Sequence, residues 1–331
     1  MKPLTPEQVD KNYMAIAISL SERGRGRTGS NPNVGAILVK DGHIVGRGWT
    51  ADGGRPHAEA GALAQAGGDA RGATAYVTLE PCAHKSERGP SCADSLIEAG
   101  ISRIVIALLD PDPRTTGIGA GRMKAAGISV STGEGADNAW RVMAGFLTRF
   151  TKARPFVTLK LATSLDGCIA MGNGESKWIT GDAARAHTHL ERSKHDAIMV
   201  GAGTVRADTP QLNVRLEGLE PYAPQPIMLG KSTPPEGWLS CAAPEKIEAL
   251  AGLNWLFVEG GAVTASSFLK AGLVDRLLLY RAPILIGGGK PALADIGLTA
   301  LDQAHGQWKL FDARQLGKDR LEVYDAVKHD S

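Results

Sequence analysis

A chain of 331 residues is longer than one typical domain of about 100 to 200 residues, so two domains are expected. Its 37 Lys and Arg residues against 35 Asp and Glu residues leave a net charge of +2, which argues against a nucleic-acid-binding surface and favours a small-molecule substrate. No apolar run approaches the roughly 18 to 20 residues of a membrane span, and charged residues interrupt positions 1–20. We therefore expect a cytoplasmic protein without a signal peptide or membrane segment.

The first half of the chain alternates helical and β-strand patterns. Apolar residues at helical spacing predict a first helix over 6–23, and a β-rich run over 34–39 leads into Asp41-Gly42, a signal typical of a hairpin turn. The further elements expected here are a helix over 58–66, a strand over 74–79, a helix from Cys92, a strand over 103–109, a helix and a strand within 123–130, and a helix over 137–152. We place the domain boundary at Arg154-Pro155, which gives domains at 1–153 and 154–331.

The motif Pro56-His57-Ala58-Glu59, followed by Pro81-Cys82 and then Cys92, predicts a zinc site. One imidazole and two thiolates are a three-ligand set that leaves tetrahedral Zn²⁺ an open position for water, which indicates catalysis. Glu59 matches the glutamate that transfers protons in zinc deaminases without binding the metal. Each part alone would favour a core histidine and two buried cysteines, and zinc could also be purely structural. Their order and context together favour a deaminase.

The loop Asp110-Pro-Asp-Pro113 follows a predicted strand. Open α/β sheets bind ligands at the carboxyl ends of their strands, so the loop is a candidate substrate contact. A surface turn of the same composition is an equally good interpretation of the sequence by itself.

The second half begins a fresh α/β pattern. A strand is expected over 156–162, a helix over 182–194, and a strand over 196–200 that runs into Gly201-Ala-Gly-Thr204. A strand over 254–258, the turn Glu259-Gly-Gly-Ala262 and a helix over 263–270 form a candidate pyrophosphate site at a helix N-terminus, although an ordinary tight turn would look the same. Strands over 275–280 and near Trp308 and Leu321 complete the sheet. The cysteines at 168 and 241 are expected to be small buried apolar residues.

Motifs throughout the chain together resemble one family. They are Asn31-Pro-Asn-Val-Gly-Ala36, Pro56-His-Ala-Glu59, Tyr76-Val-Thr-Leu-Glu-Pro-Cys82, Asp110-Pro-Asp-Pro113, Leu159-Lys-Leu-Ala-Thr-Ser-Leu-Asp-Gly167, Gly174-Glu-Ser-Lys-Trp-Ile-Thr180, Val200-Gly-Ala-Gly-Thr-Val-Arg-Ala-Asp208 and Val258-Glu-Gly-Gly261. The sequence resembles bifunctional riboflavin-biosynthesis enzymes, in which a diaminohydroxyphosphoribosylaminopyrimidine deaminase is fused to a 5-amino-6-(5-phosphoribosylamino)uracil reductase. The resemblance implies an α/β fold with a cytidine-deaminase-like N-terminal domain and a dihydrofolate-reductase-like C-terminal domain.

The resemblance also implies two consecutive reactions and their cofactors. The first is zinc-dependent hydrolytic deamination of 2,5-diamino-6-(5-phosphoribosylamino)pyrimidin-4-one, and the second is NADPH-dependent reduction of the ribosyl group to ribityl. One Zn²⁺ per chain, NADPH, a phosphorylated pyrimidine substrate and a homo-oligomer, either a dimer or a tetramer, are therefore expected.

Matching positions carry the family's functional residues. The metal ligands are His57, Cys82 and Cys92, and the proton-transferring residue is Glu59. The deaminase substrate contacts are Asn31, His84, Arg88 and Asp110. The NADPH contacts are Ala162, Trp178, Thr204, Asp208, Gly261, Ala262, Val263, Thr264, Ala265, Ser266 and Ser267. The reductase substrate contacts are Ser176, Arg192, Leu212, Arg215 and Glu259, with the two arginines as phosphate ligands.

Some positions depart from the family pattern. The segment between Cys82 and Cys92 is one residue longer than expected, and Thr50 and Asp112 stand where histidine and asparagine are common. The stretch 226–251 is shortened, with Gly230 in place of an expected Asp. An alternative is therefore a deaminase with a degenerate reductase-like domain, which NADPH binding would test. A nucleic-acid-editing deaminase is a third hypothesis, and the balanced charge argues against it.

Overall fold

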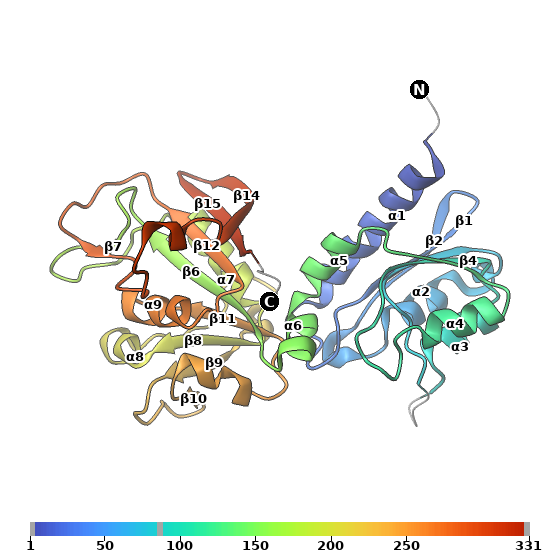
Figure 1. Cartoon of the computed structure of the whole chain (residues 1–331), viewed down its shortest axis with the longest axis horizontal. Helices are drawn as coiled ribbons and strands as arrows, with labels where there is room; N and C mark the ends of the chain where they lie inside the picture. The colour runs from blue at the N-terminus through green and yellow to red at the C-terminus, as the bar shows by residue number, and fades with distance from the viewer. Residues whose placement is uncertain (1–3, 85–88, 328–331) are drawn as a thin grey trace. The chain divides into compact units, whose positions relative to one another are not determined.

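The computed structural model describes residues 4–84 and 89–327. The chain forms two compact units, Met1–Ala153 and Arg154–Ser331 (Figure 1). Each unit has its own buried apolar core, one around the sheet of the first unit and two clusters on the sheet of the second. Among the described residues, no helix is long and apolar enough to cross a membrane.

The first unit is built on a five-stranded sheet with strand order β2-β1-β3-β4-β5. The strands are β1 (Gly35–Lys40), β2 (His43–Trp49), β3 (Thr74–Leu79), β4 (Arg103–Leu108) and β5 (Ser129–Thr132). Strand β1 is antiparallel to β2 and β3, whereas β3, β4 and β5 are parallel. The helices are α1 (Pro6–Ser21), α2 (Ala58–Ala66), α3 (Cys92–Glu98), α4 (Ile118–Ala125), α5 (Ala136–Val142) and α6 (Ala144–Lys152). The expected helix over 137–152 is thus two helices, because the backbone leaves helical geometry at Met143.

Two glycines of β2 bring α2 close to the sheet. A Cβ atom at Gly48 would lie 2.0 Å from the carbonyl oxygen of Ala58, and one at Gly46 would lie 2.2 Å from that of Ala62. Real Cβ atoms do not approach so closely, so these positions require glycine for helix-to-sheet packing. The contact with Ala58 fixes the first turn of α2, where His57 and Glu59 are found.

The second unit contains an eight-stranded sheet with order β10-β9-β8-β11-β6-β12-β15-β14. Its strands are β6 (Phe156–Thr163), β8 (Ala197–Gly201), β9 (Gln225–Leu229), β10 (Leu239–Cys241), β11 (Trp255–Glu259), β12 (Arg276–Arg281), β14 (Trp308–Leu316) and β15 (Asp319–Ala326). A two-stranded ribbon pairs β7 (Cys168–Ala170) with β13 (Lys290–Pro291). The helices are α7 (Asp182–Arg192), α8 (Ala202–Asp208) and α9 (Ala262–Lys270). The six strands from β10 to β12 are parallel, and β15 and β14 continue the sheet antiparallel.

The shortened stretch 226–251 still adds to this sheet. Strand β9 pairs with β8, and the three-residue β10 pairs with β9 at the sheet edge, before a 3-10 segment over Pro244–Ala249. Cys168 and Cys241 are both buried. The two strands expected near Trp308 and Leu321 form a hairpin of β14 and β15.

Candidate functional site

Three metal-ligating side chains meet in the first unit. His57 is the N-cap residue of α2, Cys92 is the first residue of α3, and Cys82 lies just beyond β3. The imidazole Nδ1 and the two Sγ atoms all lie within 4.8 Å of one another. Nδ1 is 3.2 Å from Sγ of Cys92 and 3.8 Å from Sγ of Cys82. These separations, and the donor set of one nitrogen and two sulfurs, fit a tetrahedral zinc ion.

The local electrostatics favour a thiolate at Cys82. The side chain of Cys92 contributes most to this effect, and hydrogen bonds from His57 and from the backbone N–H of Cys92 add to it, so the pKa of Cys82 is lowered to about 4. That N–H lies 3.3 Å from Sγ of Cys82. A thiolate is the form of cysteine that binds metal, so the chain itself prepares one ligand.

Glu59 lies in the first turn of α2 and is 4 % exposed. Burial raises its pKa to about 6. A carboxyl group in this range can both accept and release a proton near neutral pH. Glu59 and His57 line the same cavity, so the proton carrier stands beside the three metal-ligating residues.

That cavity has a volume of about 340 Å³. The predicted substrate contacts Asn31, His84 and Asp110 all line it, and Arg88 lies outside the described residues. The buried Nδ1 of His84 has no hydrogen-bond partner among the residues that the structure describes. A buried polar atom of this kind normally finds a partner, which suits a ligand in the cavity. Burial also raises the pKa of Asp110 to about 6.

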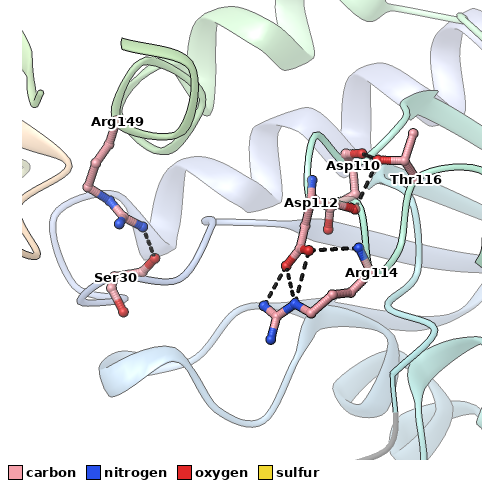
Figure 2. A network of polar contacts seen from close by, with 6 residues as sticks. All are labelled: Ser30, Asp110, Asp112, Arg114, Thr116 and Arg149. Carbon is pink, nitrogen blue, oxygen red and sulfur yellow. Dashed lines mark hydrogen bonds and ion pairs between the residues drawn. The ribbon is translucent and has the colours of Figure 1, made fainter. Parts of the chain in front are cut away.

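Sequence reasoning missed three cations that line the same cavity, Arg55, Arg114 and Arg149. Figure 2 shows that Arg114 grips the carboxylate of Asp112 and that Arg149 reaches the backbone oxygen of Ser30. The Arg149 contact is 2.6 Å long. Arg55 adjoins the His57 motif and could have been noticed, whereas nothing in the pattern of α6 distinguishes Arg149 from a solvated helix charge.

The second unit has a separate cavity of about 370 Å³ at the carboxyl ends of its parallel strands. Most predicted cofactor and substrate contacts line it: Ala162, Ser176, Trp178, Arg192, Thr204, Asp208, Arg215, Glu259 and Gly261. Leu212 lines an adjoining cavity that shares Trp178, Thr204 and Glu259. The topology explains this grouping, because β6, β8 and β11 are neighbours and end at the same edge.

Arg192 is a largely buried partner of Glu259. Its guanidinium donates from Nε to Oε1 at 2.7 Å and from Nη2 to Oε2 at 3.1 Å, and Nη1 donates to the carbonyl oxygen of Asn213 at 2.9 Å. Lys160, which the sequence analysis did not select, lies 3.9 Å from the same carboxylate. Burial lowers the pKa of Lys160, and it also lines the cavity. Arg192 is therefore engaged by a carboxylate and a backbone oxygen of this chain.

The predicted cofactor residues of α9 divide by burial. Gly261 is the N-cap residue, Ala262 is partly exposed, and Val263 is 79 % exposed. Thr264, Ala265 and Ser266 are buried, and the Ser267 hydroxyl donates to the carbonyl oxygen of Thr264. The Ser266 hydroxyl instead pairs with the backbone of Ala294. Of these predicted residues, Gly261, Ala262, Val263 and Ser267 therefore keep some exposure, whereas Thr264, Ala265 and Ser266 do not.

Two family models match the chain, one in each unit. The model described as cytidine and deoxycytidylate deaminase zinc-binding region matches residues 7–108. The model described as RibD C-terminal domain matches residues 155–236 and 243–321.

Relatives match across nearly the whole length. Riboflavin biosynthesis protein RibD of Escherichia coli is 39% identical over 94% of this chain and 97% of its own length. RibD of Mycobacterium tuberculosis is 40% identical over 93% of this chain and 95% of its own. Among solved structures, Acinetobacter baumannii RibD (form 1) has a TM-score of 0.86 at 36% identity and covers 97% of this chain and 100% of that one. The Thermotoga maritima diaminohydroxyphosphoribosylaminopyrimidine deaminase/5-amino-6-(5-phosphoribosylamino)uracil reductase has a TM-score of 0.86 at 31% identity, with coverage of 98% and 100%.

Proposed function

The chain belongs to the RibD family of bifunctional deaminase/reductases of riboflavin biosynthesis, and on that premise we propose which of its side chains carry out each reaction. The expected fold pair, a cytidine-deaminase-like domain and a dihydrofolate-reductase-like domain, is confirmed. Zinc and NADPH are the cofactors of the two units. Both family models are present, so the deaminase-only alternative is not supported.

In the deaminase unit, His57, Cys82 and Cys92 would hold zinc, which supplies an acidified water for attack on the amino-bearing carbon of the pyrimidine. The carboxylate of Glu59 would take a proton from a water held there and would give a proton to the departing amino group, which would leave as ammonia. The observation that carries this assignment is the meeting of one Nδ1 and two Sγ atoms beside the buried Glu59.

We assign the pyrimidine contacts to Asn31, His84 and Asp110, which line the deaminase cavity. The ribosyl phosphate is an anion, and guanidinium groups bind phosphate with paired hydrogen bonds. Arg149 and Arg55 are the proposed phosphate ligands among the described residues of this cavity, and Arg88 stays a prediction. Arg114 instead pairs with Asp112 through two atoms.

In the reductase unit, bound NADPH would supply the hydride that, together with one proton, converts the ribosyl group to ribityl. Its proposed contacts are Ala162, Trp178, Thr204, Asp208 and the exposed first turn of α9 from Gly261 to Val263. The backbone N–H groups of that turn suit a pyrophosphate. We keep Ser176, Leu212, Arg215 and Glu259 as proposed substrate contacts, and Arg192 acts by fixing the Glu259 carboxylate.

We further propose that the functional domains are 1–153 and 154–331, which the division into two compact units supports. The substrate is a small pyrimidine, and we propose that it is phosphorylated. We also propose that the chain forms a homo-oligomer, either a dimer or a tetramer, and that it acts in the cytoplasm. Light scattering of the purified chain tests the oligomeric state, and a monomer at micromolar concentration would refute it.

The decisive experiment follows ammonia release and NADPH oxidation in one reaction with the zinc-loaded chain and the diaminopyrimidine ribosyl phosphate. Ammonia should appear first and NADPH loss should follow. Glu59→Gln should keep one zinc per chain and lower kcat of deamination by about 10² to 10⁴ fold. Removal of zinc should stop ammonia release but leave reduction of the deaminated substrate unchanged. Full deamination by Glu59→Gln would refute the proposed proton carrier.

A further inference from the structure

Glu80 is a buried carboxylate between the metal-ligating cysteines and the substrate loop. It follows the last residue of β3, lies two residues before Cys82, and is 3 % exposed. Its own N–H donates to the carbonyl oxygen of Leu108 at the end of β4 at 2.8 Å. The residue is therefore fixed at the edge where β3 and β4 end side by side.

The Glu80 side chain accepts hydrogen bonds only from backbone N–H groups among the described residues. Oε1 accepts from Ala120 at 3.0 Å, and Oε2 accepts from Gly117 at 3.0 Å and from Asp110 at 3.4 Å. Hydrogen bonds from N–H groups to an ionised acceptor are stronger than those to a neutral one. One carboxylate thus ties both ends of the loop 110–117 and the start of α4 to β3.

That loop carries the groups that face the deaminase cavity. Asp110 and Asp112 line the cavity, and the Thr116 hydroxyl donates to their backbone carbonyl oxygens at 2.5 Å and 2.9 Å, respectively (Figure 2). The side chain of Asp110 in turn accepts from the N–H of Asp112 at 2.9 Å. The loop is closed on itself, and Glu80 links it to the end of β3.

Gly119 is a second, independent sign that this attachment is tight. A Cβ atom there would lie 2.4 Å from the carbonyl oxygen of Pro81 and 3.4 Å from Oε1 of Glu80. A side chain at position 119 would push α4 away from the segment that leads to Cys82. The close approach of α4 and the Glu80 contacts therefore belong to one arrangement.

We propose that Glu80 is a positioning residue for deamination, which holds the loop 110–117 so that Asp110 meets the pyrimidine next to the metal-ligating cysteines. This inference rests on the proposed role of Asp110 as a substrate contact. Glu80 also lines the deaminase cavity, but its carboxylate oxygens accept from backbone N–H groups, and in this scheme it acts through the backbone of the loop.

The test is Glu80→Gln in the full-length zinc-loaded chain. Glutamine has the same shape, but its NH₂ group must face either Ala120 N–H or the N–H groups of Gly117 and Asp110, so at least one of these donors loses its acceptor. We expect KM for deamination to rise about tenfold or more, with a smaller change in kcat and with zinc retained. Amide exchange at Gly117 and Ala120 should accelerate, and NADPH-dependent reduction of the deaminated substrate should not change. Glu98→Gln, on an exposed carboxylate of α3, is the matched control.

A double-mutant cycle with Asp110→Asn tests the positioning role of Glu80 separately from the role of Asp110 as a substrate contact. If Asp110→Asn leaves KM unchanged, the substrate contact itself is wrong. If Asp110→Asn raises KM and Glu80→Gln does not, or if the two effects simply add, the positioning role is wrong. Should Glu80→Gln fail to fold, Thr116→Val at an exposed position loosens the same loop. It should raise KM in the same direction, and an unchanged KM would refute the proposal.

Discussion

Arg192 at the end of α7 holds Glu259 at the end of β11 with two hydrogen bonds, although 67 residues separate them. Both side chains are 13 % exposed. A pair of parallel hydrogen bonds of this kind fixes the orientation of both the guanidinium plane and the carboxylate plane. The carboxylate that faces the reductase cavity is thus held in place by a cation that the sequence offers as a phosphate ligand.

We expect Arg192→Gln to remove reduction and to destabilise the second unit. Removal of one partner of a buried ion pair costs about 3 to 5 kcal/mol, because the other charge stays buried and uncompensated, and Lys160 offsets part of that cost. Denaturant unfolding and NADPH oxidation measure the two effects, while ammonia release should stay normal. Glu217→Gln at an exposed position is the control. Retained reduction in Arg192→Gln would contradict the role given to the pair.

The acid stability of the first unit should depend on Asp10. The Arg103 guanidinium, at 2.8 Å and 2.6 Å, contributes most to the lowered pKa of Asp10, and the Tyr76 hydroxyl adds to the effect against the cost of burial. A carboxyl whose pKa is lower in the folded state stabilises the fold above its unfolded pKa of about 3.9. That contribution disappears as the pH falls through the folded pKa. Asp10→Asn should therefore reduce stability at pH 7 and flatten its decline in acid, as measured by urea midpoints from pH 7 to 3. Equal slopes for both proteins would refute this.

Arg149→Gln should weaken binding of the phosphorylated pyrimidine in the deaminase. A hydrogen bond to a charged group contributes about 1.5 to 3 kcal/mol, which corresponds to a rise in KM of about tenfold or more. The effect should vanish with the dephosphorylated substrate, which lacks the anion. Lys152→Gln, an exposed cation of the same helix, should leave KM unchanged. Equal losses for both substrates would show that Arg149 acts on the fold, for instance through its contact with Ser30.

Gly48→Ala should disturb the metal-ligating residues from a distance. The added methyl group would meet the carbonyl oxygen of Ala58 at 2.0 Å, so α2 must move and carry His57 and Glu59 with it. Overpacking of this kind costs about 1 to 3 kcal/mol. We expect a lower melting temperature and weaker zinc retention against a chelator, whereas Gly68→Ala meets nothing within 4 Å and should change neither. A wild-type zinc affinity in Gly48→Ala would refute the link between packing and site.

The order of the motifs was enough to predict one reaction for each unit, because each motif is a short run of neighbouring residues. His57 and Glu59 lie at the start of one helix. Cys82 follows a strand and Cys92 begins a helix, and local sequence patterns predict both elements. Parallel strands end at a common edge of a sheet, so the sequence alone predicts that these residues lie close together. For the second unit, the resemblance to the family identified the expected cofactor and substrate contacts position by position.

Only the tertiary structure decided which distant groups became partners. Hydrogen bonds between Glu80 and the N–H groups of Gly117 and Ala120 join residues that no local sequence period relates. The same is true of the bonds from Arg192 to Glu259 and from Arg149 to Ser30. The tertiary structure also shows that the Ser266 hydroxyl donates to the carbonyl oxygen of Ala294, a residue that the sequence of the helix does not identify as its partner. The sequence by itself determined the chemistry that is available at each strand end. Packing determined which charged side chains face the substrate cavities and which ones instead hold other residues in position.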